Sequence, residues 1–319
     1  MAGKKKAPVE ANPLLEQLRF VASILKPKGE PNETCCVIAN GAITALNPPL
    51  SVGILTQAAI TANPPALQLL AALERCKDGY AMTETRGTVA LTSGPLRVSL
   101  PTVQGLAPSA PDAYREALPG ALFDAIAQIS HIADEDAEHV QSASICIEEG
   151  LVSTTNRNVI LQAYHGLNMP AMMLPKRFVK AVTDAIGKFN KTIVGMGHGV
   201  ASFTVFFDDN SWLKTQLMDA EPLPYSKVCA KEGGFKPLPD IWEALDNVMP
   251  FRGNTDAVRF EDDAIKTDTA SYEQILGERI KINADYLKSC KPHIENYAID
   301  NGKFYFYKGN VRGVIALME

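Results

Sequence analysis

The stretch KRFVKAVTDAIGKF, residues 176–189, decides the fold, because it predicts an amphipathic helix whose two faces differ in chemistry. At about 100° per residue, its apolar side chains gather on one side as a stripe. This stripe consists of Phe178, Val182, Ala185, Ile186 and Phe189. The opposite side collects the basic residues Lys176, Arg177, Lys180 and Lys188, together with Lys191 just beyond the helix. Such a helix packs on a core through one face and presents a basic face outward.

The elements around this helix recur three times along the chain. Each repeat contains an amphipathic helix, extended hairpins, a second amphipathic helix and a final strand–turn–strand unit. The predicted helix pairs are residues 14–25 and 66–76, 122–133 and 176–189, and 238–249 and 284–290. The finishing strands follow at residues 87–101, 200–219 and 294–318. The period of roughly 110 residues is far above that of solenoid repeats, so each pass has the size of a domain.

These repeats predict an α+β fold of three domains, in each of which two helices pack on antiparallel β-sheets. We place the domains at residues 1–118, 119–236 and 237–319. The boundaries fall in two stretches rich in proline and glycine, LAPSAPDAYREALPG at 106–120 and AKEGGFKPLPD at 230–240. The third domain, with about 83 residues against about 118 for the others, is shortened between Leu276 and Ile280.

The composition is that of an ordinary globular protein, with 46% hydrophobic and 21% charged residues. No apolar run approaches the roughly 18 residues that span a bilayer, so we expect no membrane contact. The start, MAGKKKAP, is not followed by the apolar segment of a secretory signal. The six cysteines form no CxxC pair, which fits a reducing compartment and argues against structural zinc. We therefore expect a cytoplasmic protein.

Positive charge is local in this chain, because the formal net charge is −5 while the 176–191 helix has a single acidic residue, Asp184. A basic helix face can meet the phosphates of nucleic acid. The plainer interpretation is a solvated helix face. The residues of this helix alone leave both interpretations open.

Acidic clusters occur at residues 134–136, 148–149, 208–209 and 261–263. A two-metal nuclease needs carboxylates that converge on one point, but each cluster lies at a separate predicted turn, where acidic side chains are simply soluble. His198 in GMGHG, residues 195–199, has no phosphate-loop context, and no serine lies in a GxSxG elbow. We therefore expect no catalytic residue, no metal and no cofactor. A metal-dependent nuclease that uses the acidic clusters stays as an alternative.

Several stretches resemble the bacterial DNA polymerase III β sliding clamp family. LLEQLRFVASIL at 14–25, followed by a proline-containing loop, is similar to the opening helix of the clamp. GLVSTTNRNVILQAYH at 150–165 stands where the clamp strand usually reads L-x-x-x-A-T-D-G-H-R-L. LMDAEPLPYSKV at 217–228 resembles the pattern D-G-x-F-P-x-Y-x-x-V. The final VRGVIALME at 311–319 resembles the apolar clamp terminus, which usually reads V-x-P-M-R-L.

In that family six such domains, three from each of two subunits, close a ring around duplex DNA, with helices lining the hole. The resemblance implies a DNA sliding clamp, which is a non-enzymatic processivity factor that forms a homodimeric ring. Its partners would be double-stranded DNA, a DNA polymerase and a clamp loader. Lysines in such a ring hold DNA by charge without reading bases. The resemblance assigns this role to Lys26, Lys28, Lys176, Lys180, Lys188 and Lys191.

The resemblance also implies an apolar pocket for partner peptides and an interface between subunits. Carried over by position, the pocket consists of Asn156, Asn158, Val159, Leu161, Leu223, Lys227, Val228, Ile315, Leu317 and Met318. The plain alternative for the apolar members is ordinary core. The interface, which joins edge strands of the first and third domains, falls on Val98, Leu100, Ile275 and Leu276.

The sequence departs from the family pattern at three places. Arg157, Asn158, Val159 and Ile160 replace the usual D-G-H-R, so the peptide specificity is expected to differ. The methionine–proline pair of the clamp terminus is absent, and the third domain is shortened where the interface should lie. Such a trimmed form suggests a clamp encoded by a phage or plasmid. A repeat-built virion or assembly protein is a further alternative.

Overall fold

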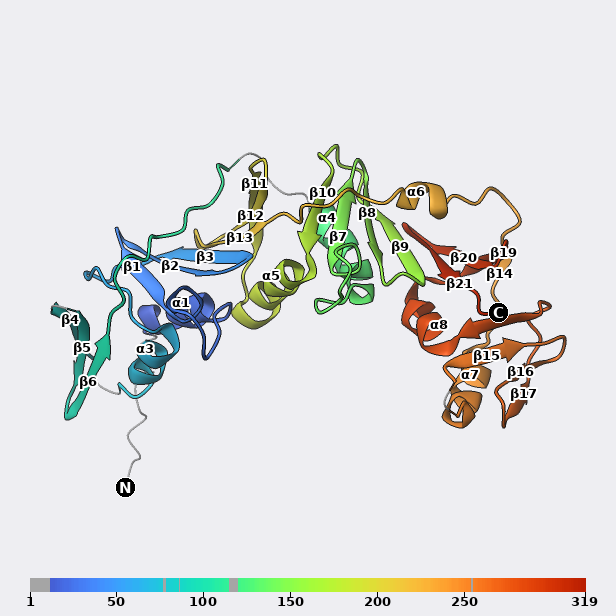
Figure 1. Cartoon of the computed structure of the whole chain (residues 1–319), viewed down its shortest axis with the longest axis horizontal. Helices are drawn as coiled ribbons and strands as arrows, with labels where there is room; N and C mark the ends of the chain where they lie inside the picture. The colour runs from blue at the N-terminus through green and yellow to red at the C-terminus, as the bar shows by residue number, and fades with distance from the viewer. Residues whose placement is uncertain (1–11, 77–78, 86, 115–119, 254) are drawn as a thin grey trace, which may run out of the picture. The chain divides into compact units, whose positions relative to one another are not determined.

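The computed structural model describes residues 12–76, 79–85, 87–114, 120–253 and 255–319. These residues form an α+β structure of helices and antiparallel sheets, as predicted. The chain divides into two compact units. Unit 1 comprises residues 1–118 and 177–217, and unit 2 comprises residues 119–176 and 218–319 (Figure 1).

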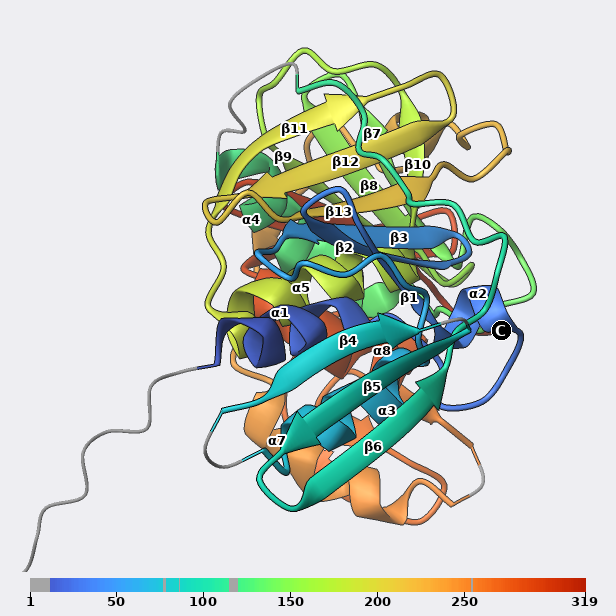
Figure 2. The same cartoon turned by 90° about the vertical axis from the view of Figure 1, so that its left-hand side faces the viewer.

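Unit 1 contains one large and one small antiparallel sheet. Its helices are α1 (Pro13–Ala22), α2 (Pro31–Thr34), α3 (Ala66–Leu73) and α5 (Lys176–Phe189), the last of which begins at the unit boundary. The large sheet has the order β1 (Cys36–Ala39), β2 (Ala42–Asn47), β3 (Leu50–Leu55), β13 (Trp212–Gln216), β12 (Ser202–Phe207) and β11 (Ile193–His198). The small sheet has the order β4 (Ala81–Thr85), β5 (Thr88–Ser93) and β6 (Leu96–Pro101). Figure 2 shows both sheets of this unit facing the viewer.

Unit 2 contains an eight-stranded and a four-stranded sheet. Its helices are α4 (Gly120–Ile129), α6 (Tyr225–Val228), α7 (Trp242–Val248) and α8 (Ala284–Cys290). The larger sheet has the order β10 (Met172–Pro175), β7 (Ser144–Glu148), β8 (Leu151–Thr155), β9 (Val159–Tyr164), β21 (Val311–Ala316), β20 (Lys303–Lys308), β19 (Asn296–Asp300) and β14 (Lys236–Pro237). The smaller has the order β17 (Ser271–Glu273), β16 (Ala264–Lys266), β15 (Ala257–Phe260) and β18 (Ile280–Asn283).

Two helices begin at a side chain that caps the helix start, whereas the bounds of α3, α4 and α7 differ from the predicted ones. The Asn12 side chain accepts a hydrogen bond from the Leu15 amide at 3.4 Å, and Pro13 follows as the first residue of α1. Asn283 caps α8 in the same way, accepting from the Tyr286 amide at 3.0 Å. The observed α5 and α8 have the predicted bounds.

The apolar stripe of α5 is buried almost as predicted. Phe178, Val182 and Ala185 are buried, and the Phe189 ring meets Phe20 of α1 edge to face with 5.5 Å between centroids. Ile186 differs from the prediction, because its side chain is 42% exposed. It lies at the border of the stripe, where Val179 takes the buried place instead.

Each of the two large sheets joins strands from two sequence repeats. In unit 1, β3 pairs with β13, and Gly53 lies opposite Trp212. A Cβ at Gly53 would collide with the indole ring of Trp212, so glycine lets this ring cover the junction. In unit 2, β9 pairs with β21. The compact units therefore cut across residues 119–236, and the division into three domains stays a prediction. The first predicted boundary, at 118, lies outside the described residues.

The glycines of the GMGHG stretch make room for another segment of the chain that crosses them, and not for a ligand. A Cβ at Gly195 would collide with the Tyr114 ring, and a Cβ at Gly197 would collide with the Ala113 carbonyl. Asp112 fastens the same segment, because its carboxylate accepts hydrogen bonds from Ser202 at 2.8 Å and from Lys214 at 2.9 Å. These glycines leave the space in which residues 112–114 lie against the sheet.

Candidate functional site

The exposed side of α5 carries the basic residues of the predicted nucleic-acid surface. Lys180 and Lys188 are exposed, whereas Arg177 is half-buried and donates to the Pro48 carbonyl at 3.4 Å. Lys188 also pairs with Asp184, one turn away, at 3.0 Å. This pair is exposed and weak, so it can open when a phosphate approaches.

Lys191 lies apart from this surface. Its side chain is 7% exposed, forms an ion pair with Asp209, and places its nitrogen 4.0 Å from the centroid of the Phe20 ring. Burial opposes the ionisation of Asp209, but hydrogen bonds from Lys191 and Ser211 outweigh it and hold the pKa of Asp209 below its usual value. The Lys191 side chain is therefore part of the core of unit 1, and we leave it out of the proposed DNA surface.

The three remaining lysines differ in their surroundings. Lys26 and Lys28 are exposed in the loop after α1, and Lys26 pairs with Glu33 at 2.6 Å. Lys176 is half-buried and donates to the Ser130 carbonyl in unit 2. Lys26 and Lys28 therefore have the exposure that phosphate contacts require, whereas Lys176 is partly occupied within the protein.

Three residues of the predicted peptide pocket are buried on one face of their sheet. Val159, Leu161 and Ile315 are all fully buried, with 0% exposure. Val159 pairs with Ile315 across β9 and β21, so these side chains share one face of the sheet. They are core residues, as the plain alternative held, and cannot line an open groove.

The neighbouring residues occupy the opposite face, which α6 covers. Ala298, Tyr305, Val314 and Ile160 pair in a row across β19, β20, β21 and β9. The side chains of Val228 and Phe235, which are partly exposed like that of Ile160, pack on this row together with Cys229. Gln162 reaches from β9 to Ser226 of α6 at 3.4 Å. This face is the candidate peptide site, and a one-residue shift along β9 and β21 separates it from the predicted one.

Other predicted pocket residues lie beside this face or form the turn next to it. Leu223 is 45% exposed and Lys227 is exposed, so both remain available. Asn156 instead closes the turn between β8 and β9, because its side chain accepts from the amides of Asn158 at 3.1 Å and Val159 at 2.8 Å. Asn158 donates to the Tyr286 hydroxyl at 3.2 Å.

The C-terminal residues are held by backbone hydrogen bonds. The Leu317 amide donates to the Gly302 carbonyl at 2.9 Å, and the Met318 amide donates to the Lys281 carbonyl at 2.9 Å. The Met318 side chain is still 40% exposed. The predicted apolar terminus is thus anchored through its backbone, and the Met318 side chain remains accessible.

Of the four predicted interface residues, one is exposed, one is half-buried and two are buried. Val98 of β6 is half-buried, and Ile275 is 65% exposed. Leu100 and Leu276 are 6% and 5% exposed, and the Leu276 carbonyl accepts from Tyr297 at 3.0 Å. Val98 and Ile275 are therefore the two of this set that are accessible to a second subunit.

The acidic clusters form local contacts with neighbouring groups. Asp262 pairs with Arg279, whose hydrogen bond lowers the pKa of Asp262. Glu261 likewise accepts from Lys266 at 2.5 Å. Among the described residues, no three His, Cys, Asp or Glu side chains form a group that could hold a metal ion. No helix in the same part of the chain is long and apolar enough to cross a membrane.

The three-dimensional structure resembles solved bacterial sliding clamps along nearly its whole length. A DNA polymerase sliding clamp from Pseudomonas aeruginosa with a ligand has a TM-score of 0.79 at 12% identity, and a C. crescentus β sliding clamp has 0.78 at 14%. The Helicobacter pylori β clamp bound to a DNA ligase peptide has 0.74 at 13%. In each case the match covers 96% of this chain and 97% of the other.

No protein-family model matches the sequence, and no curated protein matches it. The likeness is therefore one of structure at low identity. The chain has the fold of the DNA polymerase III β sliding clamps, as the sequence patterns implied.

Proposed function

We propose that this protein is a DNA sliding clamp, a processivity factor that encircles duplex DNA in the cytoplasm and tethers a polymerase without catalysing a reaction. The observation that carries the proposal is the clamp fold over 96% of the chain. Fold alone does not determine function, so the proposal also depends on the surfaces described above.

The proposed DNA surface consists of Lys26, Lys28, Lys180 and Lys188. All four are exposed, and they lie on α5 and in the loop after α1. Long basic side chains contact phosphates without reading bases, which is what a ring that slides requires. Replacing Lys180 and Lys188 by glutamate should lower retention on DNA and flatten its salt dependence, since each phosphate contact contributes about 0.9 to the slope.

The proposed peptide site is the face of the eight-stranded sheet beside α6. The accessible apolar side chains of Ile160, Val228 and Phe235 offer anchors for a partner segment. The Helicobacter pylori clamp is a structural neighbour that was solved with a DNA ligase peptide. By analogy we assign to this face the docking of polymerase and clamp-loader peptides.

The proposed ring is a homodimer closed through Val98 on β6 and Ile275 beside β17. Both strands are edges of their sheets, and edge strands can pair with another chain. Ile275 is the more exposed of the two residues at 65%, which favours a contact surface.

The deciding experiment measures the solution mass and images the particles. A homodimeric ring predicts a mass of about twice 34.5 kDa and particles with a central hole. Ile275→Asp should convert the dimer to a monomer, whereas Ile186→Asp, on the exposed border of α5, should leave the dimer intact. A compact monomer at micromolar concentration with no hole would refute the ring.

Retention on DNA then tests encirclement itself. A closed ring that has been loaded on circular DNA stays on it and leaves after the circle is cut, because sliding off needs a free end. Equal retention before and after cutting would show binding without encirclement.

A further inference from the structure

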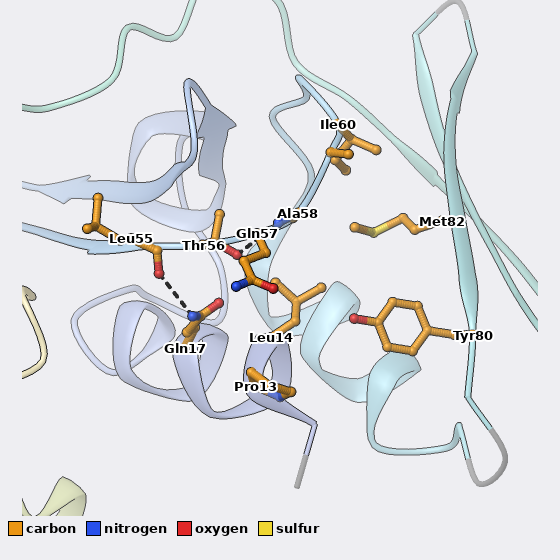
Figure 3. Close-up of a pocket in the computed structure, with 11 residues that line it drawn as sticks. Pro13, Leu14, Gln17, Leu55, Thr56, Gln57, Ala58, Ile60, Tyr80 and Met82 are labelled. Carbon is orange, nitrogen blue, oxygen red and sulfur yellow. Dashed lines mark hydrogen bonds between the residues drawn. The ribbon is translucent and has the colours of Figure 1, made fainter. Parts of the chain in front are cut away.

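Unit 1 contains a slot that none of the proposed clamp surfaces uses. It has a volume of about 570 Å³ and lies between α1, the segment 55–60 and β4. Figure 3 shows Leu14 at one side, Ile60 at another, and Tyr80 and Met82 pointing in from β4 and the residue before it. The lining is largely apolar, so the slot can accept further apolar side chains.

The two long walls of the slot are stretches of backbone with open hydrogen-bonding positions. Among the described residues, β4 pairs with β5 alone. Opposite β4, the amides of Gln57, Ala59 and Ile60 have no hydrogen-bond partner in the same part of the chain. Glu84 of β4 joins the walls at one end, where its carboxylate accepts from the Thr61 amide at 3.3 Å. An extended segment between the walls can pair with both.

In the third repeat the chain itself covers the equivalent edge. There the strand β14 comes just before the first helix, α7, and pairs antiparallel with β19, the first strand after the second helix, α8. Pro237 of β14 lies opposite Asn296, the first residue of β19. The amide of Leu238 donates to the Glu295 carbonyl at 2.9 Å. The edge of this sheet is therefore closed by the segment that leads into the first helix of the repeat.

The second repeat follows the same plan. Residues 112–114 precede its first helix, α4, and lie against β11, which is the first strand after α5 and an edge of the six-stranded sheet. The Tyr114 hydroxyl donates to the Val194 carbonyl of β11 at 3.2 Å. In two repeats, the residues before the first helix thus cover the first strand after the second helix. In the first repeat that strand is β4, and the corresponding segment is the stretch before α1.

We propose that residues 4–9 of this chain, which lie outside the described residues, occupy the slot as a strand that pairs antiparallel with β4. We call this segment the strap. Its far end is already fixed beside the slot, because the Tyr80 hydroxyl, just before β4, donates to the Asn12 side chain, just before α1, at 3.5 Å. A chain that reaches Asn12 along β4 runs opposite to β4, as β14 runs opposite to β19.

The third repeat also gives the register of the strap. Pro237 precedes the first residue of α7 by five positions, and Pro8 precedes the first residue of α1 by the same five. Pro8 then lies opposite Ala81, the first residue of β4, as Pro237 lies opposite Asn296. A proline at this place is therefore part of the plan, although it cannot donate a backbone hydrogen bond.

This register brings matching side chains to the slot. Alternate residues of a strand point to the same face, so the residues opposite Tyr80, Met82 and Glu84 all point into the slot. In the same order these residues are Val9, Ala7 and Lys5. The two apolar side chains enter the apolar part of the slot. The lysine meets the only charged residue of β4, and opposite charges across a strand pair stabilise it.

An occupied slot leaves β6 as the open edge of the small sheet. We assign β6 to the contact between subunits, so the consequence for assembly rests on the proposed function. An uncovered β4 would be a second edge that could pair with another chain. The strap closes this edge and restricts assembly to the other side of the sheet.

Zero-length coupling tests the register on the unchanged full chain. A carbodiimide joins a lysine amine to a carboxylate only where the two groups touch, and peptide mass mapping identifies the pair. We expect a cross-link between Lys5 and Glu84. Coupling of Lys5 to other carboxylates but not to Glu84 would overturn the proposal.

A mixture of isotope-labelled and unlabelled chains shows which chain supplies the strap. Cross-links within single chains support the proposal. Cross-links that join labelled to unlabelled chains would mean that a second copy occupies the slot, and the proposed strap would be refuted.

Hydrogen exchange gives a measurement that does not depend on the coupling. The amides of Gln57, Ala59 and Ile60 should exchange at least about tenfold faster in Val9→Asp than in the unchanged chain, because a carboxylate cannot stay in the apolar slot and the strap leaves it. Pro8→Asp is the matched control, since it places the same residue one position away, on the face that points to solvent. It should leave the exchange of these amides unchanged.

Equal exchange in the unchanged chain and in Val9→Asp would overturn the proposal, and so would an equal acceleration by both aspartates. Neither DNA nor dimerisation enters these measurements. Their failure would therefore leave the proposed clamp function untouched, and failure of the ring would leave the strap in place.

Discussion

The side-chain nitrogen of Lys191 lies 4.0 Å from the centre of the Phe20 ring and links the end of α5 to α1. Phe20 is 2% exposed, so this ammonium group faces the interior of unit 1. Asp209 supplies the opposite charge, and Ser211 supports that carboxylate. A buried, paired charge of this kind contributes to the packing of α5 and does not belong to the exposed basic face of that helix.

Lys191→Ala should therefore destabilise the protein by about 2 kcal/mol, the scale of a desolvated cation–π contact. Lys188→Ala is the matched control, because this exposed lysine is only 3 residues away and forms a weak pair. It should change the stability by less than about 0.5 kcal/mol and lower the affinity for DNA. Urea unfolding and salt-dependent DNA binding measure the two effects. The reverse assignment, with Lys188 stabilising and Lys191 binding, would contradict the proposed surface.

The contact between Tyr114 and Gly195 predicts a coupled pair of substitutions. Gly195→Ala should destabilise the protein, because the new Cβ would meet the Tyr114 ring. Tyr114→Ala should relieve this clash, so the double variant should be more stable than the sum of the single effects predicts. The expected coupling is about 1 kcal/mol, measured by a double-mutant cycle in urea.

Gly197 provides the control for this cycle. Its added Cβ would meet the carbonyl oxygen of Ala113, which is backbone and cannot be removed by a side-chain change. Tyr114→Ala should therefore leave the cost of Gly197→Ala unchanged. Relief at both glycines would mean that the ring acts on the whole segment rather than on Gly195.

Sequence patterns were sufficient to predict the repeated elements. The period of 3.6 residues identified α5 and α8 with their observed bounds, because each helix has a clear apolar stripe and a clear start. The bounds of α1 are shorter than predicted, ending at Ala22 rather than residue 25. The helix stops there because the next residues turn into the proline-containing loop, and terminal turns fray.

The candidate site was harder to predict, because tertiary contacts decide it. Periodicity places Lys191 near the basic face, but only the fold brings Phe20 and Asp209 to its side chain. Alternation along β9 shows that Ile160 and Leu161 face opposite sides, yet the side that α6 covers depends on a helix 60 or so residues later. The glycines of GMGHG had no visible partner in the sequence, since residues 112–114 lie far before them.

Adjacent residues of β9 face opposite sides of the sheet, so aspartate substitutions at positions 160 and 161 should have opposite outcomes. Ile160→Asp should abolish binding of the DNA ligase peptide seen on the Helicobacter pylori clamp, or of another clamp-binding peptide, while the protein stays folded. Leu161→Asp should unfold unit 2, because this side chain is 0% exposed and a buried carboxylate costs several kcal/mol. Circular dichroism and peptide anisotropy separate the cases. If Ile160→Asp binds as well as the unchanged chain, the peptide site lies elsewhere.

The stacked pair of His131 and His293 predicts that unit 2 loses stability in weak acid. His131 bonds the Ser289 carbonyl at 3.0 Å, His293 bonds the Gln128 carbonyl at 3.0 Å, and the two rings stack with 5.8 Å between centroids. Burial lowers the pKa of His293, and the nearby positive charges of His131 and Lys308 lower it further. The folded protein therefore resists a proton that the unfolded chain accepts near pH 6.5.

The lowered pKa of His293 determines how the stability depends on pH. The stabilisation is fully present above about pH 6.5 and declines as the pH falls below it, because protonation then favours the unfolded chain. His293→Gln removes the titrating group while keeping a side-chain donor for the Gln128 carbonyl. Its melting temperature should fall less than that of the unchanged chain between about pH 7.5 and about pH 5.5, a range above the titration of most carboxylates. His198→Gln, in unit 1, should keep the dependence of melting temperature on pH that the unchanged chain shows. An equally steep dependence for His293→Gln would show that His293 does not cause the loss of stability in weak acid.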